Sequence, residues 1–194
     1  MSTLSICVYC GSRLGEAGLH ADAARVIGTE IGRRGWQLVY GGGRAGLMGV
    51  VADAALAAGA AVVGVIPQSL MARELGHTGL TELHVVETMH ERKMMMAERS
   101  DAFLALPGGI GTFEELFEVW SWRQLGYHDK PLGLLNVAGY YDALLTFLQQ
   151  SRDQGFMSQM QLNLLQVEAD PLAMLQGLGE LSRRATAPDD YRRI

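Results

Sequence analysis

Two glutamates follow a glycine-rich loop in the stretch LPGGIGTFEE, residues 106–115. The loop ends an apolar run and opens a helical pattern, and such an arrangement attracts phosphate through free backbone N–H groups and the helix dipole. Glu114 and Glu115 therefore stand where an anion is expected. A carboxylate at this place is useful when the ligand extends from its phosphate to a bond that the carboxylate helps to break.

A sugar phosphate fits that description. A 5′-phosphate held by the glycines would bring the anomeric carbon of the sugar near the first helical turn. Glycosidic cleavage passes through an oxocarbenium-like transition state, which a carboxylate stabilises while it positions water. A structural alternative is equally open on the pattern alone, because Thr112 and Glu115 have the T-x-x-E spacing of a capping box.

The first glycine loop of the chain, YGGGRAGLMG, lies earlier than the second one in LPGGIGT and contains G-x-G-x-x-G at Gly41, Gly43 and Gly46. A dinucleotide site is disfavoured, because the loop follows the second predicted strand, Arg44 interrupts it, and the expected ribose-binding acid is absent about 20 residues later. The glycines could simply make a tight turn. We favour a backbone cradle for a single phosphate, formed by Gly41, Gly42 and Gly43.

The composition indicates a single core and a small ligand. The chain has 194 residues, 48% of them hydrophobic, and a formal net charge of −5. We expect one nucleotide-binding catalytic domain over residues 1–182 and a flexible tail over 183–194. Without a basic run, a signal peptide pattern or a membrane-length apolar run, the sequence favours a cytoplasmic protein that binds neither a nucleic acid polymer nor a membrane.

Short apolar runs alternate with helical patterns along the chain. This alternation predicts an α/β, Rossmann-like, doubly wound and mostly parallel sheet with helices on both faces. One predicted helix carries Ala23, Val26, Ile27 and Ile31 on its apolar face and stops near Gly35. In such sheets ligands bind beyond the carboxyl ends of the strands, so both glycine loops should lie there. The expected strands are residues 4–10, 36–40, 61–67, 82–87, 101–107, 131–137 and 164–170.

The remaining reactive side chains favour neither redox nor metal chemistry. Cys7 and Cys10 are interpreted as two small buried residues near a strand end rather than a redox pair. No two histidines have a metal-ligand spacing with acids beside them, so we predict no metal. A pyridoxal phosphate enzyme would need a Schiff-base lysine, and only Lys93 and Lys130 are present.

Several motifs resemble the LOG ("Lonely guy") family of cytokinin-activating phosphoribohydrolases, formerly described as lysine decarboxylases. PGGIGTFEE is similar to the family's P-G-G-x-G-T-x-x-E, and VYCGSR, YGGGRAGLMG, MHERK, SDAFLALPGG and QLGYHDKPLGLLNV also match in order. The resemblance implies a Rossmann-like homodimer or higher homo-oligomer, without a cofactor. It also implies hydrolysis of a cytokinin nucleoside 5′-monophosphate, or AMP, to the free base and ribose 5-phosphate. A non-catalytic nucleotide sensor on the same fold is the alternative.

The resemblance also implies roles for particular residues. Arg92 and Glu115 match the catalytic pair, and Arg92 is expected to hold Glu115 ionised and to orient it or the substrate. Glu74 matches a further substrate contact, although this chain has LMARE where plant members have LMPRE. The residues that match the nucleotide-binding run are Lys93, Gly108, Gly109, Gly111, Thr112 and Glu114.

Two apolar groups have open interpretations. Trp120 stands in EVWSW where plant members have EVITW, so it is a candidate modifier of the base pocket. Trp120 and Trp122 either contribute to a dimer interface or pack their helix on the sheet. Met94, Met95 and Met96 are interpreted as packing residues, with a dimer interface as a further possibility.

Overall fold

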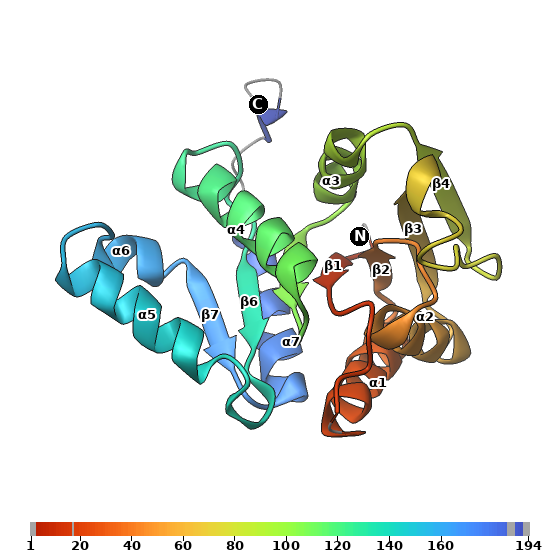
Figure 1. The fold of residues 1–194 in the computed structure, drawn as a ribbon, viewed down its shortest axis with the longest axis horizontal. Coiled ribbons are helices and arrows are strands. Elements are labelled where there is room, and N and C mark those ends of the chain that lie inside the picture. The colour runs from red at the N-terminus through yellow and green to blue at the C-terminus, as the bar shows by residue number, and fades with distance from the viewer. Residues whose placement is uncertain (1–2, 17, 186–188, 192–194) are drawn as a thin grey trace.

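Seven short apolar segments form one parallel sheet in the order β4-β3-β2-β1-β5-β6-β7 (Figure 1). The computed structural model describes residues 3–16, 18–185 and 189–191. Every predicted strand is present, and the α/β, Rossmann-like fold class is confirmed. The strands are β1 (Ser5–Tyr9), β2 (Gln37–Tyr40), β3 (Ala61–Pro67), β4 (Glu82–Val86), β5 (Ala102–Ala105), β6 (Leu132–Leu135) and β7 (Leu165–Glu168).

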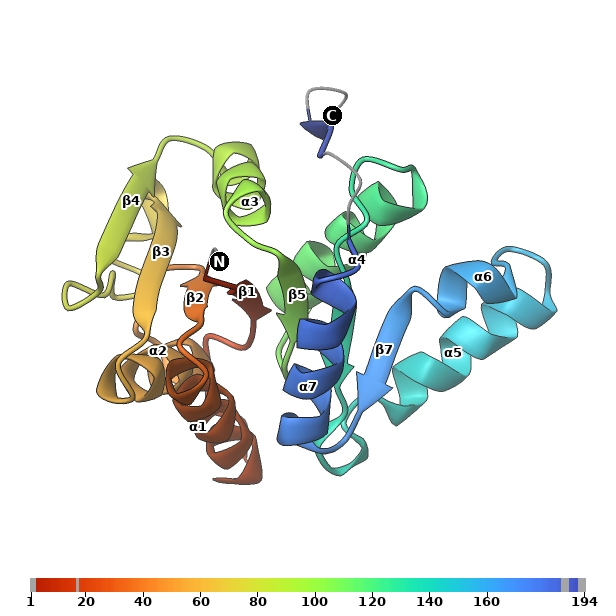
Figure 2. The same ribbon diagram turned by 180° about the vertical axis from the view of Figure 1, so that it is seen from behind.

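Helices cover both faces of the sheet, and the five inner strands alternate their side chains between two apolar layers (Figures 1 and 2). In β1, for example, Ile6 packs with one layer and Cys7 with the other. Helices α1, α2 and α7 contribute to the first layer, and α3, α4 and α5 contribute to the second. The helices are α1 (Gly18–Arg33), α2 (Gly46–Ala57), α3 (Met89–Glu98), α4 (Ile110–Gln124), α5 (Asp142–Asp153), α6 (Gln159–Leu162) and α7 (Pro171–Ser182), with short 3₁₀ turns at Gln68–Leu70 and Val137–Gly139.

The order of the strands reverses beside β1. The chain first builds outward from β1 through β2 and β3 to β4, and then returns to place β5 on the other side of β1. The loops that leave β1 and β5 therefore diverge at the carboxyl edge of the sheet, which is where open α/β sheets bind ligands. The glycine loop LPGGIGT, which leads from β5 into helix α4, lies at this carboxyl edge beside β1.

Helix α1 differs from its prediction at one position. Val26 is 39% exposed, whereas Ala24 and Gly28 are buried beside the predicted Ile27 and Ile31. A Cβ on Gly28 would lie 2.3 Å from the Val51 carbonyl oxygen of α2. Small residues thus let α1 and α2 approach closely, and Ala24 and Gly28 occupy the buried face of α1 in place of Val26. The predicted stop is confirmed, since Gly35 has a left-handed φ of 67°.

Residues 189–191 pack against the second apolar layer. Tyr191 is 7% exposed, its ring lies 5.8 Å from that of Trp122, and Asp189 forms a 2.6 Å ion pair with Lys130. These contacts fall within the predicted tail, and the domain bounds stay a prediction, since 186–188 and 192–194 lie outside the described residues. Cys7 and Cys10 are both buried and unbridged, which confirms their interpretation as small buried residues near a strand end.

None of the helices in the described ranges has the length and apolarity that crossing a membrane requires.

Candidate active site

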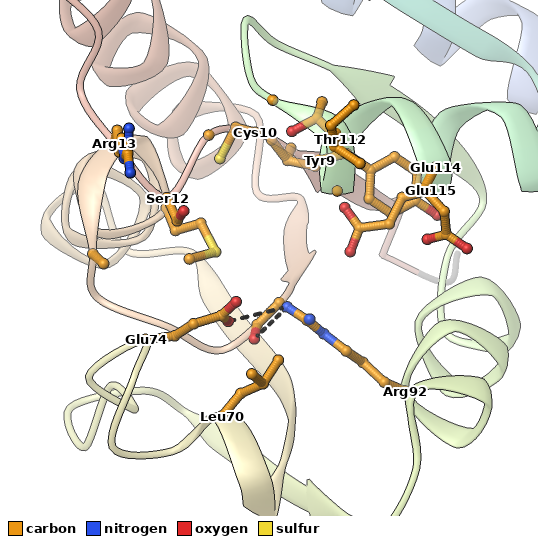
Figure 3. Close-up of a pocket in the computed structure, with 18 of the residues that line it drawn as sticks. Tyr9, Cys10, Ser12, Arg13, Leu70, Glu74, Arg92, Thr112, Glu114 and Glu115 are labelled. Atoms are coloured by element: carbon orange, nitrogen blue, oxygen red, sulfur yellow. Dashed lines mark hydrogen bonds and ion pairs between the residues drawn. The ribbon is translucent and has the colours of Figure 1, made fainter.

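A cavity of about 510 Å³ opens where the strand order reverses (Figure 3). Its size is within the usual range of small-molecule sites, roughly 300 to 1,000 Å³. The segments after β1, β2 and β5 form its walls, together with helix α3 and the loop after β3. These segments are far apart in sequence, and the sheet topology brings them to one edge.

Arg92 reaches the cavity from the first turns of α3. The start of this helix is fixed by a capping box, in which Thr88 and Glu91 exchange side-chain and backbone hydrogen bonds. The Arg92 side chain is 4% exposed and donates from Nε to the Val65 carbonyl at 3.1 Å and from Nη2 to the Gly41 carbonyl at 3.0 Å. Backbone oxygens of two strand ends therefore hold the guanidinium in place.

The acidic partner of Arg92 is Glu74. The Glu74 Oε2 atom lies 3.5 Å from Arg92 Nη2, and both side chains point into the cavity (Figure 3). The assignment of Glu74 to the site depended on the motif LMARE, which differs from the LMPRE of plant members. The structure places Glu74 in the same cavity as Arg92 and Glu115. The three charged groups expected from the family motif therefore converge.

Glu115 lies in the cavity wall, and its carboxyl makes no hydrogen bond to another described residue. Burial raises the pKa of the Glu115 carboxyl to about 7, and the opposing attraction of Arg92 is too weak to cancel this effect. Arg92 lowers this pKa, which is the direction expected of a cation that favours the ionised carboxylate, but burial has the larger effect. A carboxyl with a pKa near neutrality exchanges protons readily at physiological pH.

Helix α4 begins earlier than the capping-box prediction requires. Gly109 occupies the N-cap position and no side chain caps the helix, so Thr112 lies within the first turn. The capping-box interpretation of Thr112 and Glu115 is therefore wrong. The first intrahelical bond of α4 runs from the Phe113 N–H to the Gly109 carbonyl, which leaves the N–H groups of residues 110–112 without an acceptor in the helix.

These backbone groups border the cavity, and the glycines beside them leave room for a ligand. Added Cβ atoms on Gly109 or Gly111 would meet no heavy atom within 4 Å, and both residues line the cavity. The fold itself does not need glycine there. The helix start therefore has the properties expected of a phosphate cradle, with open space in front of free N–H donors.

The first glycine loop is packed against the protein instead. Gly42 has a φ of 75°, and a Cβ on it would lie 3.1 Å from the Ile66 side chain; a Cβ on Gly43 would lie 2.9 Å from the Glu74 carbonyl oxygen. Of the three predicted cradle glycines, only Gly41 lines the cavity. The structure therefore differs from the expected cradle at Gly42 and Gly43, and the tight-turn alternative describes them.

Lys93 and Gly108 lie beside the cavity rather than in its wall. The Lys93 ammonium bonds to Glu114, which does line the cavity, and to Glu118 at 2.9 Å. The Gly108 carbonyl accepts a 2.7 Å hydrogen bond from the Tyr140 hydroxyl. The predicted nucleotide-binding run therefore divides into the wall residues Gly109, Gly111, Thr112 and Glu114 and two residues that support them.

The tryptophans and methionines of the motif region mainly form the core. Trp120 and Trp122 are buried in the layer that contains α4, and Trp120 donates from Nε1 to the Gln161 carbonyl. The packing interpretation is confirmed, and Trp120 does not border the cavity as a base-pocket residue would. Met96 is fully buried, and Met94 and Met95 pack against the same layer.

Sequence reasoning missed part of the cavity wall. Ser12 and Arg13 line it, although CGSR was noted only as part of a motif. Met48, Leu70 and Met89 supply an apolar side that the sequence did not indicate. Within the described ranges, no cluster of three or more His, Cys, Asp or Glu side chains is arranged to hold a metal ion.

Comparisons with known proteins identify the family of the chain. A family model described as "Possible lysine decarboxylase" matches residues 48–178. Two cytokinin riboside 5′-monophosphate phosphoribohydrolases of Arabidopsis thaliana are 53% and 54% identical over 153 residues, which is 79% of this chain and 72% and 71% of theirs. The chain belongs to the LOG family. The family resemblance deduced from the sequence motifs is thus confirmed.

Solved structures agree with the fold of this LOG family member. A molybdenum cofactor binding protein from Rippkaea orientalis superimposes with a TM-score of 0.72 at 20% identity, covering 93% of this chain and 98% of its own. A molybdenum cofactor carrier protein from Chlamydomonas reinhardtii gives 0.71 at 22% identity, covering 94% and 99%. At these identities the similarity concerns the fold alone.

Proposed function

We propose that this protein hydrolyses the N-glycosidic bond of nucleoside 5′-monophosphates, of the cytokinin type or AMP, to release the base and ribose 5-phosphate. The names of relatives over 50% identical support the reaction. One observation of the structure carries the proposal most directly. Glu115 lies in the same cavity as the open N-terminus of its own helix. Its Cα atom is about 4.5 Å further along the helix axis than that of Thr112.

The phosphate would bind at the start of α4. The free N–H groups of residues 110–112 supply donors, and the glycines on either side of Ile110 allow a phosphate to approach the backbone. Arg13, from the loop after β1, lines the same cavity and adds positive charge. A phosphate held at this end directs the attached ribose along the helix toward Glu115.

Glu115 would then act on the anomeric carbon. As the C1′–N bond breaks, its electron pair goes to the base nitrogen, and the oxygen of a water molecule bonds to C1′. The Glu115 carboxylate stabilises the positive charge on the ribose and accepts the proton that water loses. The departing base nitrogen takes up one proton from solvent, and Glu115 then releases its proton to solvent, which restores the carboxylate. The pKa of about 7 suits this transfer at neutral pH.

The Arg92 and Glu74 pair would orient the ribose. Arg92 is committed to two backbone carbonyls, so its main effect is to fix the Glu74 carboxylate in the cavity. A carboxylate so held can accept hydrogen bonds from the ribose hydroxyls. The apolar residues Met48, Leu70 and Met89 line the cavity and offer a surface for the base.

A pyridoxal phosphate decarboxylase is not supported, despite the description of the family model. Both lysines of the chain are engaged away from the cavity wall: Lys93 bonds to two glutamates, and Lys130 Nζ donates to the Ala97 carbonyl at 2.8 Å. Neither ammonium is placed to form a Schiff base with a ligand in the described cavity.

The finer expectations remain part of the proposal. We propose that the protein forms a homodimer or higher homo-oligomer, on the basis of the family resemblance. The cytoplasmic location expected from the sequence is likewise a proposal. Light scattering at micromolar concentration tests the assembly, and a monomer would contradict it.

Incubation with AMP tests the function. We expect free adenine and ribose 5-phosphate to appear in equal amounts on chromatography, and Glu115→Gln to release far less of both. If AMP and isopentenyladenosine monophosphate both bind to the wild-type protein but remain intact, the protein is a nucleotide sensor and the proposed reaction is wrong.

A further inference from the structure

The loop that carries Glu74 needs support from its surroundings. Residues 71–80, which follow the 3₁₀ turn after β3, contain no regular helix or strand. Leu75, next to Glu74, has a left-handed φ of 53°. This conformation is unfavourable for leucine, and it persists only where contacts with the rest of the protein enforce it.

The first glycine loop supplies part of that support through its backbone. The N–H groups of Arg44 and Ala45 donate to the Glu74 carbonyl at 3.0 and 3.3 Å, and the His77 N–H donates to the Gly42 carbonyl at 2.9 Å. The absence of a side chain on Gly43 permits this close approach, because a Cβ there would lie 2.9 Å from the Glu74 oxygen. The loop is therefore bonded along the glycine turn.

The His77 side chain supplies the other part. It is 4% exposed and both ring nitrogens are used: Nδ1 accepts from the Gly79 N–H at 3.1 Å, and Nε2 lies 2.9 Å from Asp53 Oδ1 on α2. Because Nδ1 is an acceptor, the ring proton is assigned to Nε2, which donates it to Asp53. The imidazole thus links the loop to a helix of the first apolar layer.

We propose that His77, oriented by Asp53, is a positioning residue that holds Glu74 in its place opposite Arg92. His77 does not line the cavity, so it acts through the loop and not on the ligand. The role of Glu74 in the reaction rests on the proposed function, whereas the mechanical link between His77 and the loop does not.

The contact between Glu74 and Arg92 requires accurate placement of the Glu74 carboxylate. This carboxylate meets Arg92 Nη2 at 3.5 Å, the long end of hydrogen-bond distance, and the same nitrogen is already held by the Gly41 carbonyl at 3.0 Å. A small shift of the loop would separate Glu74 from Arg92. Misplacement of a binding group by about 1 Å can lower the rate about a hundredfold.

A set of variants tests the proposal. His77→Leu removes both ring bonds, whereas His77→Gln retains a side-chain N–H that can reach Asp53. We expect His77→Leu to lower kcat/KM for AMP by about tenfold to a hundredfold, and His77→Gln to recover part of this loss. His84→Leu is the matched control, because it removes another 2.9 Å histidine–carboxylate pair, with Glu82 on β4, and should leave activity unchanged.

The Glu74→Gln background separates positioning from general damage. If His77 acts through Glu74, adding His77→Leu to Glu74→Gln should lower kcat/KM by less than about twofold more, since coupled residues are not additive. Full additivity of the two losses would overturn the proposal.

Hydrogen exchange separates this inference from the proposed reaction. His77→Leu should speed exchange of the backbone amides in residues 71–79 while helix α2 stays protected. If the wild-type protein does not cleave AMP, the proposed reaction fails, and the exchange rates together with the calorimetric Kd for AMP still decide the role of His77. Unchanged exchange in this loop with unchanged AMP affinity would overturn it.

Discussion

The two glycine loops look alike in sequence and serve different purposes in the structure. After β2, Gly42 and Gly43 make room for the protein's own chain, because added Cβ atoms would meet Ile66 and Glu74. After β5, Gly109 and Gly111 face open space beside free backbone N–H groups. A glycine-rich motif therefore does not by itself indicate a phosphate site. The informative observation is what would occupy the space of the missing side chain.

The largest effect should come from the carboxylate beside the second loop. Glu115→Gln keeps the size of the side chain and removes its charge, so we expect turnover of AMP to fall by about a hundredfold or more with the fold retained. Steady-state kinetics and circular dichroism measure the two properties. Near-normal turnover in the folded variant would return Glu115 to a structural role.

Alanine substitution in each loop tests the comparison itself. Gly42→Ala requires a left-handed alanine packed against Ile66, so we expect the free energy of unfolding to fall by about 2 kcal/mol or more. Gly111→Ala should leave stability within about 0.5 kcal/mol, because nothing meets its Cβ. Its Kd for AMP should instead rise by about tenfold, the cost of weakening one charge-assisted hydrogen bond.

Denaturant unfolding and calorimetric titration of the same two variants provide the readout. A destabilised Gly111→Ala, or a fully stable Gly42→Ala, would show that the division between the loops is incorrect.

The pH dependence of activity should reflect Glu115. The reaction uses its carboxylate, and its pKa is raised to about 7, so kcat/KM for AMP should rise with pH up to about 7 and then level off. The negative charge of Glu114 contributes to the raised pKa. Glu114→Gln should therefore shift this rise in kcat/KM to lower pH. If the rise stays at the same pH, a group other than Glu115 controls it.

A smaller effect concerns stability. The folded pKa of Glu115 lies above its ordinary value of 4.5, so the folded state binds its proton more tightly than the unfolded state. Its charge thus opposes folding increasingly as pH rises from 4.5 to about 7. Glu115→Gln should raise the Tm relative to wild type at pH 8 and should lose this advantage at pH 4. An equal difference at both pH values would contradict the raised pKa.

Much of the fold was predictable from local pattern. Near-continuous apolar runs separated by helical segments indicated each strand, and the reversal beside β1 follows the rules for doubly wound sheets. The sequence pattern did not show that Gly28 is buried on α1 while Val26 is exposed. Gly28 lies against helix α2, and a pattern within α1 carries no information on that contact. Contacts of this kind arise between segments far apart in sequence.

The site was predictable in its residues and less so in its interactions. Motif matching found Glu74, Arg92 and Glu115, which the structure brings into one cavity. It did not show that Arg92 pairs with Glu74, or that burial controls the pKa of Glu115. Nor did it indicate His77, since a single histidine in a polar loop has no sequence signal that distinguishes it from a surface residue.

The measurement that tests the central claim most directly compares AMP with adenosine as substrates. If the second glycine loop holds the 5′-phosphate, adenosine loses charge-assisted hydrogen bonds worth about 1.5 to 3 kcal/mol each. Two such losses lower kcat/KM by about a hundredfold or more. We therefore predict that AMP is cleaved at least about a hundredfold more efficiently than adenosine. Equal kcat/KM values for the two would contradict the account, because the open loop after β5 would then be only a turn.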